Sequence, residues 1–221
     1  MNIVVYSGKG GDGKTPIATN IALDKKFGVC TNEHFHVFDG FINEDNLIAI
    51  KANEPFPNIP SEFNVVFDLA GSITENSVSI TSALTQADLV IVPVSNEVKA
   101  LTAGIGTIKE ILRFTNNILI VATKLEKGRK ELFGDDWYQS REYLNVKNQV
   151  HHYAGDLPVI PLKYSKVFNT IFEQEMSIRQ IMNSDPLAKH NFKQVAEQFD
   201  EIYKHIEGVK NDAKQRIAKS A

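Results

Sequence analysis

The sequence opens on a short apolar run, Ile3–Tyr6, which leads directly into the glycine-rich stretch SGKGGDGKTP. The residues from Gly8 to Thr15 match the pattern G-x-x-x-x-G-K-[ST] of a phosphate-binding loop. Glycines allow backbone N–H groups to turn inward around a polyphosphate, and the helix that follows adds the partial positive charge of its N-terminus. The motif therefore predicts an α/β fold in which a strand leads into this loop and a helix leaves it.

The loop predicts a site for a nucleotide polyphosphate and Mg²⁺. Lys14 would reach the β- and γ-phosphates, and the Thr15 hydroxyl would hold the magnesium ion. Pro16 has no N–H to donate to the α-phosphate, so we expect it to weaken nucleotide binding by about 1.5–3 kcal/mol at most. The residues expected to contact the nucleotide here are Gly8, Lys9, Gly10, Gly11, Asp12, Gly13, Lys14, Thr15 and Pro16.

Further short apolar runs alternate with helical patterns along the chain. Such runs are typical of strands that are buried on both faces of a parallel sheet. Apolar residues at helical spacing follow the loop, recur from Val98 to Leu112, and recur again from Phe192 to Ile206. We therefore expect a doubly wound, mostly parallel α/β sheet with helices on both faces. The expected strands, besides the first, are Val65–Leu69, Leu89–Val94, Ile118–Ala122 and Val159–Leu162.

The last helical pattern predicts where the domain ends. Asp185 and Pro186 form a helix start signal, and Gly208 is expected to stop the helix. We therefore expect one domain over residues 1–208 and a polar, mildly basic tail over 209–221. No apolar stretch approaches the roughly 20 residues that span a bilayer, so a cytoplasmic location is expected.

Composition excludes several kinds of site. The single cysteine, Cys30, excludes a disulfide framework and a multi-cysteine iron–sulfur site within one chain. The histidines His34, His36, His151 and His152 match no standard metal-ligand spacing, and we assign them no role. With 24 basic and 27 acidic residues the net charge is −3, which does not predict a surface that is coated by nucleic acid throughout.

Lys9 adds a second lysine to the loop, which reads K-G-G-D-G-K-T up to Thr15. In this feature the sequence resembles the deviant Walker A ATPases of the ParA and MinD type, and the resemblance covers nearly the whole chain. It implies a P-loop NTPase fold and an ATP-sandwich dimer. In that dimer Lys9 would cross the interface to the other subunit's nucleotide, so that Lys9 and Lys14 both take part in catalysis.

The stretch FNVVFDLAG, residues 63–71, resembles the Walker B strand of this family. The resemblance implies that Asp68 binds magnesium through water, in company with Thr15. Asp68 also falls at the carboxyl end of a predicted strand, where open α/β sheets bind their ligands. A structural aspartate that ends a strand and begins a turn is the alternative.

The region after the first predicted helix departs from the family, whose members carry a strand ending in D-x-D-P-Q. The second aspartate of that motif helps to place the attacking water. The stretch GVCTNEHF puts residues 32–34 there, at the better distance from Gly28, whereas HVFDGFIN supplies Asp39 with Phe41 in place of the second acid. Asp39 is the better chemical candidate, so we assign it a catalytic role. Because neither alignment supplies both acids, hydrolysis is expected to be slow or to need a stimulating partner.

The resemblance also places the adenine base beside two later strands. Thr123 and Lys124, in ILIVATKLEK, stand where family members approach the base. Pro161, Leu162 and Lys163 begin the base-flanking loop. These five residues complete the predicted nucleotide site.

The surface on which the dimer assembles is the most variable feature of the family. ParA-like proteins bind DNA without sequence preference through basic residues on late helices, and MinD-like proteins use an amphipathic membrane helix. Only Val209 and Ile217 are bulky and apolar in the tail, which favours DNA over membrane. Interspersed acidic residues leave an ordinary solvated surface open. The candidate DNA-binding residues are Lys189, Lys193, Lys204, Lys210, Lys214 and Arg216.

Together, these features indicate a slowly ATP-hydrolysing dimerisation switch for partition of a plasmid or other DNA. Such a homodimer would associate with the nucleoid when it holds ATP, and a centromere-binding or other stimulating partner protein would reset it. The alternative is a nucleotide-binding scaffold or a MinD-like positioning protein with little or no ATPase activity.

Overall fold

The computed structural model describes residues 1–70, 77–131 and 136–220, apart from the side chains of residues 77, 130, 213, 214 and 216–220. Within these residues one seven-stranded sheet has the order β3-β2-β4-β1-β5-β6-β7. Every neighbouring pair is parallel. The strands are β1 (Asn2–Val5), β2 (Gly28–Thr31), β3 (Leu47–Ala49), β4 (Val65–Asp68), β5 (Leu89–Ser95), β6 (Ile118–Leu125) and β7 (Val159–Lys163).

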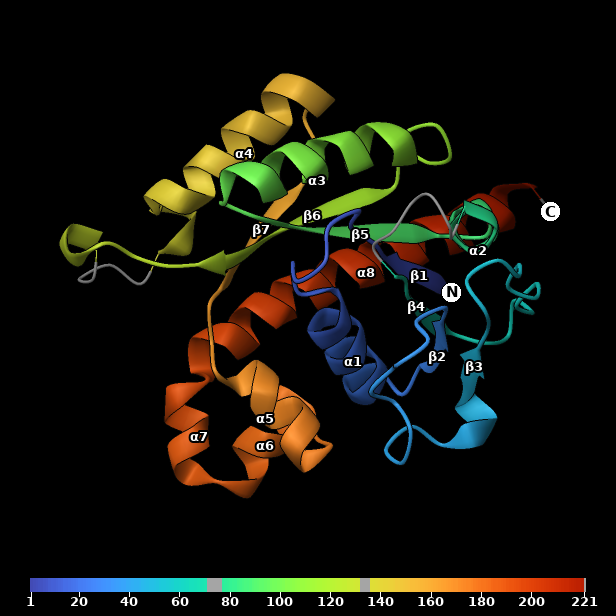
Figure 1. Cartoon of the computed structure of the whole chain (residues 1–221), viewed down its shortest axis with the longest axis horizontal. Helices are drawn as coiled ribbons and strands as arrows, with labels where there is room; N and C mark the ends of the chain where they lie inside the picture. The colour runs from blue at the N-terminus through green and yellow to red at the C-terminus, as the bar shows by residue number, and fades with distance from the viewer. Residues whose placement is uncertain (71–76, 132–135, 221) are drawn as a thin grey trace.

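Helices cover both faces of the sheet. One face carries α1, α5, α6, α7 and α8, and the other carries α2, α3 and α4 (Figure 1). Their bounds are α1 (Lys14–Lys25), α2 (Ser77–Thr85), α3 (Val98–Ile111), α4 (Arg141–Ala154), α5 (Val167–Gln174), α6 (Ile178–Ser184), α7 (Pro186–Asn191) and α8 (Lys193–Ser220). Three single turns are 3₁₀ helices: η1 (Glu44–Asn46), η2 (Arg129–Glu131) and η3 (Trp137–Gln139).

The doubly wound α/β fold and its five predicted strands are confirmed. Two strands, β2 and β3, were not among those predicted; the three residues of β3 lie at the edge of the sheet, where they are partly or fully exposed. An edge strand of this length carries little periodic signal.

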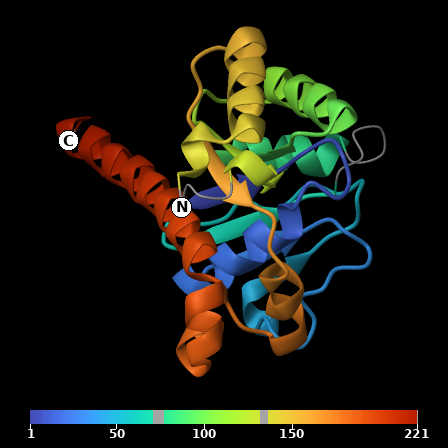
Figure 2. The ribbon, with the colours of Figure 1, turned by 90° about the vertical axis from the view of Figure 1, so that its left-hand side faces the viewer.

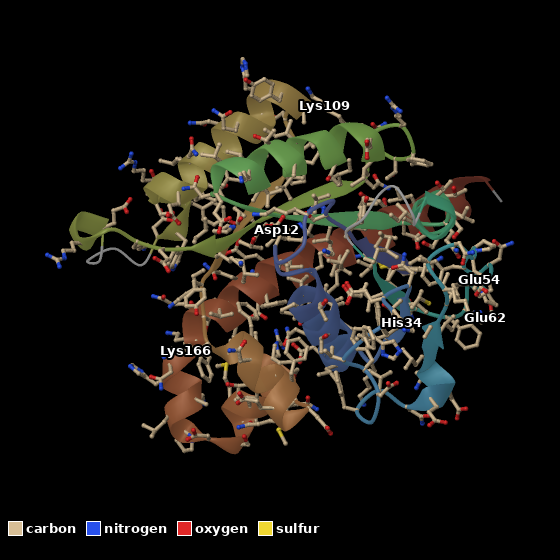
Figure 3. All side chains as sticks on the ribbon, in the orientation of Figure 1. Asp12, His34, Glu54, Glu62, Lys109 and Lys166 are labelled. Carbon is tan, nitrogen blue, oxygen red and sulfur yellow. The ribbon has the colours of Figure 1, made fainter. Side chains whose placement is uncertain are left out.

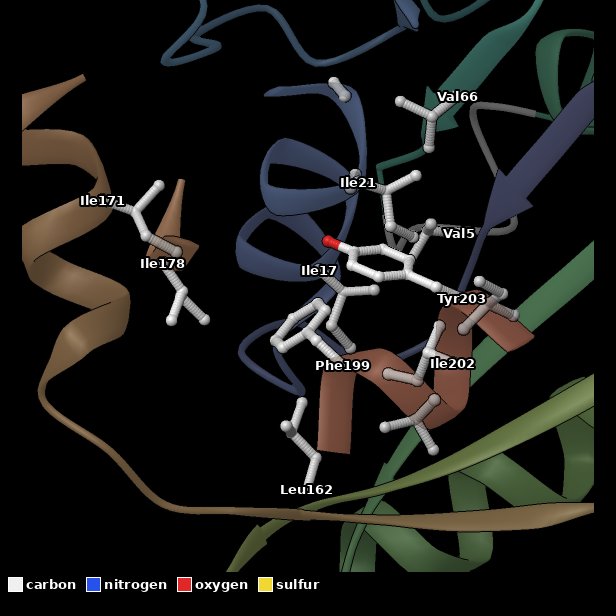
Figure 4. Close-up of a cluster of buried hydrophobic side chains, with 14 of the residues drawn as sticks. Val5, Ile17, Ile21, Val66, Leu162, Ile171, Ile178, Phe199, Ile202 and Tyr203 are labelled. Atoms are coloured by element: carbon white, nitrogen blue, oxygen red, sulfur yellow. The ribbon is translucent and has the colours of Figure 1, made fainter. Parts of the chain in front are cut away.

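The helix after the glycine loop packs as its apolar spacing predicts. Ile17 and Ile21 of α1 are buried, and Figure 4 shows them among Val5 of the sheet and Phe199 and Tyr203 of α8. Each fully buried aliphatic side chain contributes about 1.5–3 kcal/mol to the free energy of unfolding. The beginning of α1, and with it the glycine loop, is therefore held firmly against β1.

A close approach fixes the position of α3. A Cβ at Gly104 would lie 2.9 Å from Val94 Cγ2 of β5, so only glycine allows the helix to pack at this depth. Glu97 precedes the first turn of α3, and Thr107 lies near its middle. The close packing therefore places both residues beside the glycine loop.

The predicted helix stop at Gly208 is wrong. Asp185 and Pro186 begin the short helix α7, in which the Asp185 carboxylate accepts a hydrogen bond from Leu187 N at 2.8 Å. The longer helix α8 begins at Lys193 and continues through Gly208 to Ser220, so the predicted boundary between residues 208 and 209 falls inside it. Glycine is less favourable than alanine inside a helix by about 1 kcal/mol. Burial of Ile206 stabilises this part of α8 by more than that. The C-terminal end of α8 projects away from the rest of the molecule (Figure 2).

Candidate nucleotide-binding site

The carboxyl ends of the parallel strands meet at one edge of the sheet. In the strand register, Asp68 of β4 lies between Val5 of β1 and Thr31 of β2. On the other side of β1, Ser95 of β5 lies opposite Thr123 of β6. The segments that follow these strands therefore converge on the glycine loop, as in other open α/β sheets that bind ligands.

A cavity of about 370 Å³ lies at this convergence. Its size falls within the range of pockets that hold small molecules and cofactors. The glycine loop and α1 form one side, and the segment from β7 into α5 forms another; Figure 3 labels Asp12 on the first and Lys166 on the second. The lining residues are Gly10, Gly11, Asp12, Gly13, Lys14, Thr15, Pro16, Ile17, Glu33, Thr123, Lys124, Leu162, Tyr164, Ser165, Lys166, Phe168 and Asn169.

The glycine loop curls back over the side chain of Lys14. Gly11 and Gly13 have φ angles of 83° and 94°, in the left-handed region that glycine adopts most easily. The Lys14 side chain is buried, and its Nζ donates a hydrogen bond to the Lys9 carbonyl oxygen at 3.2 Å. An ammonium group therefore lies within the glycine loop at the first residue of α1, a position suited to holding an anionic polyphosphate.

Asp68 brings a buried carboxylate to the same edge. Neither of its oxygens is within hydrogen-bond geometry of a partner among the described residues, although the Thr15 hydroxyl is close enough to lower its pKa. Burial, reinforced by the nearby charge of Glu33, raises the pKa of Asp68 to about 7, while Thr15 and Lys14 act in the opposite direction. A buried carboxylate without partners is unfavourable until a cation or a proton compensates it. Asp68 and the Thr15 hydroxyl are therefore a fitting pair of oxygen donors for Mg²⁺.

Lys9 points away from the cavity. Its Nζ lies 2.9 Å from Glu97 Oε2, at the beginning of α3, and both side chains are solvent-accessible. The hydrogen bond to Glu97 is the main cause that raises the pKa of Lys9, and Lys9 in turn lowers the pKa of Glu97. Gly8 and Lys9 lie outside the lining of the cavity; Gly8 N donates to Thr107 Oγ1 at 3.1 Å. The two lysines of the loop thus face different directions.

The fold that carries this site is shared with solved structures. No family model matches the sequence, and no curated protein matches it. Apo McdA from Cyanothece is similar over 90% of this chain and 98% of its own, with a TM-score of 0.62 and 16% identity. MinD from Pyrococcus horikoshii OT3, in complex with Mg-ADP, is similar over 91% of this chain and 96% of its own, with a TM-score of 0.61 and 15% identity.

A third similar structure is a candidate plasmid partition protein from Borrelia burgdorferi B31, bound to AMPPNP. It covers 90% of this chain and 98% of its own, with a TM-score of 0.52 and 17% identity. The chain has the fold of the ParA- and MinD-type P-loop ATPases.

Within this ParA/MinD-type fold, the structure does not place Asp39 at the cavity. Asp39 is exposed, and its Oδ1 lies 3.7 Å from His36 Nδ1. The preceding residue, Phe38, is fully buried in the core, which leaves Asp39 turned toward solvent. Glu33 lines the cavity instead, so the carboxylate follows β2 directly, as in the alignment favoured by the distance from Gly28.

Asn32, next to Glu33, has a structural role. Its Nδ2 donates to Ser79 Oγ and its Oδ1 accepts from Ala70 N, both at 2.7 Å. The side chain therefore ties the end of β2 to α2 and to the segment after β4. These bonds hold the backbone of Glu33 near Asp68. Gly71, the last residue of the Walker B stretch, lies outside the described residues.

The predicted base-binding residues divide between two sides of β7. Leu162 lines the cavity together with Thr123 and Lys124. Pro161 lines a separate cavity of about 240 Å³ with η3 and α8, and Lys163 N donates to Gln198 Oε1 of α8 at 3.0 Å. Successive side chains of a strand point to opposite faces, which explains this division.

Several residues of the cavity were not predicted as site residues. Tyr164, Ser165 and Lys166 line it from the segment between β7 and α5, and Phe168 and Asn169 line it from the first turn of α5. No motif marks them, although the stretch that contains them was assigned to the base-flanking loop. Tyr164 is about half exposed, so its ring is free to face a base.

The predicted DNA-binding lysines lie on α7 and α8 and remain a prediction. Lys193 Nζ lies 3.7 Å from Glu197 Oε1, one turn further along α8, and Lys204 is exposed. Lys189 is exposed on α7, whereas Lys210 is half-buried near the chain's N-terminus. The side chains of Lys214 and Arg216 are outside the described part of the structure.

Two kinds of feature are absent from the described residues. No group of three or more histidine, cysteine, aspartate or glutamate side chains is arranged to hold a metal ion. No helix combines the length and the apolar character that crossing a membrane requires.

Proposed function

We propose that this protein is an ATP-dependent dimerisation switch that hydrolyses ATP slowly and serves DNA partition. The observation that carries the proposal is the glycine loop with its two lysines: Lys14 is buried and bonded to the Lys9 carbonyl oxygen, and Lys9 faces outward. In this proposal the second, outward ammonium group serves a nucleotide that another copy of the chain holds. The similar structures include complexes with Mg-ADP and AMPPNP, which supports nucleotide binding at this loop.

The site fits a magnesium-bound triphosphate. The loop amides and Lys14 would neutralise the phosphates, and the base would enter between Thr123, Leu162 and Tyr164. Thr15 and Asp68 would hold the Mg²⁺ ion, which supplies charge neutralisation between the phosphates. Binding of the cation would also relieve the unfavourable burial of the Asp68 carboxylate.

Dimerisation would bring Lys9 to the partner's nucleotide. In the single chain its ammonium is satisfied by Glu97. Exchange of that carboxylate for a triphosphate replaces one negative charge by several, which favours the dimer when ATP is present. ADP lacks the γ-phosphate and would hold the dimer less firmly.

Slow hydrolysis follows from the small number of groups available to orient water. Among the described residues, Glu33 is the carboxylate that lines the cavity besides the loop residue Asp12. We propose Glu33, in place of Asp39, as the residue that orients the attacking water. The like charge of Asp68 lies close to Glu33, which makes Glu33 less effective at orienting water. A partner protein that held the Glu33 side chain toward the water would therefore raise the rate of hydrolysis.

The partition role rests on the basic residues of α7 and α8, and on the similarity to a candidate plasmid partition protein. In this proposal the ATP-bound dimer doubles the number of phosphate contacts and associates with the nucleoid, and a centromere-binding partner resets it. A MinD-like positioning protein or a nucleotide-binding scaffold is the second candidate, favoured by Pro16 and by the position of Asp39 outside the cavity.

The test is the size of the protein in Mg²⁺ with ADP, ATP or a slowly hydrolysed ATP analogue. We expect a monomer with ADP and a dimer with the analogue. Lys9→Ala should bind the analogue and stay monomeric, whereas the matched control Lys51→Ala should dimerise like the parent. A parent that stays monomeric when saturated with the analogue contradicts the dimerisation switch. Phosphate release with DNA and partner present then separates an ATPase from a scaffold.

A further inference from the structure

The side chain of Asp12 occupies an unusual place for an acid, beneath a loop that is shaped for phosphate. Asp12 is 1% exposed. Its Oδ2 accepts a hydrogen bond from Ser7 Oγ at 3.0 Å, and its Oδ1 accepts one from Ser95 Oγ at 3.3 Å. The Asp12 carbonyl oxygen accepts a third from Thr123 Oγ1 at 2.9 Å.

These bonds attach the loop to the ends of three strands. Ser7 follows β1, Ser95 ends β5, and Thr123 lies in β6. Asp12 stands between Gly11 and Gly13, whose backbones are the most permissive in the loop. Without an anchor at this point, the amides on either side would sample several directions. Asp12 therefore fixes the direction of the amides that line the cavity.

The charge of Asp12 works against the same site. Both side-chain partners are neutral hydroxyls, and no ion pair within the described residues includes Asp12. Its charge reaches the loop nonetheless: after the hydrogen bond to Glu97, the charge of Asp12 contributes to the raised pKa of Lys9. In a buried setting such a charge is weakly screened, so it repels a bound polyphosphate.

We propose that Asp12 is a positioning residue that holds the loop in its phosphate-binding shape, and that its negative charge lowers the affinity of the site for triphosphate. This inference rests on the proposed binding of triphosphate at the loop. An asparagine can keep both contacts, because its Oδ1 accepts from one serine hydroxyl and its Nδ2 donates to the other. Asp12→Asn therefore removes the charge and keeps the anchor, whereas Asp12→Ala removes both.

The experiment measures the affinities of ATP, ADP and AMP for the parent, Asp12→Asn and Asp12→Ala by titration calorimetry. We expect Asp12→Asn to bind ATP about five- to tenfold more tightly, with a smaller gain for ADP and almost none for AMP. The gain should shrink at high salt. Asp12→Ala should bind all three nucleotides more weakly. Glu62→Gln removes an exposed charge far from Asp12 (Figure 3) and should change none of these values.

A purely structural role of Asp12 predicts no gain that grows with phosphate charge. Equal or weaker ATP binding by a folded Asp12→Asn variant would therefore overturn the inference. A parent that binds no nucleotide overturns the proposed function separately. In that case, inorganic triphosphate is the probe. If Asp12→Asn binds it more tightly than the parent does, the role of Asp12 is supported, and if neither protein binds it, that role is refuted.

Discussion

At the scale of single residues, Pro16 is the clearest departure within the glycine loop. It is the third residue of α1 and lines the cavity. The N–H at such a position has no partner inside the helix and is free to bind a ligand. Proline removes this donor. The substitution that restores it therefore tests whether the site is weakened by its own sequence.

We expect Pro16→Thr to bind ATP more tightly than the parent, by up to about 1.5–3 kcal/mol, since a hydrogen bond to a charged group is restored. Titration calorimetry with Mg-ATP measures the change. Pro16→Ala is the matched control, because it restores the N–H without adding a hydroxyl, and it should show the same gain. If both variants bind ATP no better than the parent, the missing donor is not what limits affinity.

Asp68 makes stability depend on pH. Its pKa is about 7 in the folded protein and about 3.8 when exposed. Between these values the folded protein holds a proton that the unfolded chain has released, so stability falls as the pH rises through this window. Asp68→Asn removes the penalty, and at pH 8 without Mg²⁺ it should be more stable than the parent by up to about 4 kcal/mol.

Denaturant unfolding at pH 4 and pH 8 checks this expectation. The stability difference between Asp68→Asn and the parent should be small at the lower pH and large at the higher one. Asp45→Asn, an exposed acid in η1, is the control and should show no such trend. The same Asp68→Asn protein should lose the stabilisation that Mg-ATP gives the parent. A constant stability difference across the two pH values would contradict the raised pKa.

The residues that sequence reasoning placed correctly at the cavity are those with a local signal. Lys14 and Thr15 follow from the loop pattern, and both line the cavity. Sequence reasoning chose Asp39, whereas Glu33 lines the cavity, because the choice depends on the burial of Phe38, which is a property of the folded core. No pattern within a few residues of Asp39 reports that burial.

At the scale of elements, α3 controls where Lys9 points. Glu97 precedes its first turn and holds the Lys9 ammonium at 2.9 Å. An exposed ion pair of this kind is weak, so a bound triphosphate can displace it. In the proposed dimer, Glu97 would therefore compete with the partner's nucleotide for Lys9.

We expect Glu97→Gln to dimerise at an ATP-analogue concentration a few-fold lower than the parent needs, because Lys9 no longer has a competing carboxylate. Sedimentation velocity across a titration of the analogue measures this. Glu110→Gln, an exposed acid of the same helix, is the control and should leave the midpoint unchanged. A higher midpoint for Glu97→Gln would mean that Glu97 supports the dimer rather than opposing it.

Elements were predictable where a periodic pattern was strong. The face of α1 that includes Ile17 and Ile21 is buried as its spacing indicates. The end of α8 was not predictable, because Gly208 acts as a stop only where no tertiary contact continues the helix. Burial of Ile206 and partial burial of Val209 supply that contact. Local propensity is a weak guide wherever packing decides.

At the scale of the whole molecule, a net charge of −3 requires that any DNA contact be local. The candidate residues lie on α7 and α8, and Lys204 is an exposed member without an acidic partner among the described ion pairs. Each phosphate contact steepens the plot of the logarithm of the binding constant against the logarithm of salt concentration by about one unit. A dimer makes each such contact twice.

We therefore expect Lys204→Glu to weaken DNA binding by the ATP-bound dimer and to reduce its salt slope by about two. Fluorescence anisotropy with a duplex of arbitrary sequence, at several salt concentrations, measures both quantities. Lys51→Glu changes the net charge equally at a site outside α7 and α8 and should have little effect. Equal losses in the two variants would show that overall charge, not this surface, governs binding.

The anchoring of the glycine loop has a kinetic consequence. Gly8 N is bonded to Thr107, the Asp12 carbonyl to Thr123, and the Lys9 carbonyl to Lys14. A loop that its own bonds hold in one shape needs no slow rearrangement on encounter, so nucleotide capture should be fast. Differences in affinity among nucleotides would then appear almost entirely as differences in residence time.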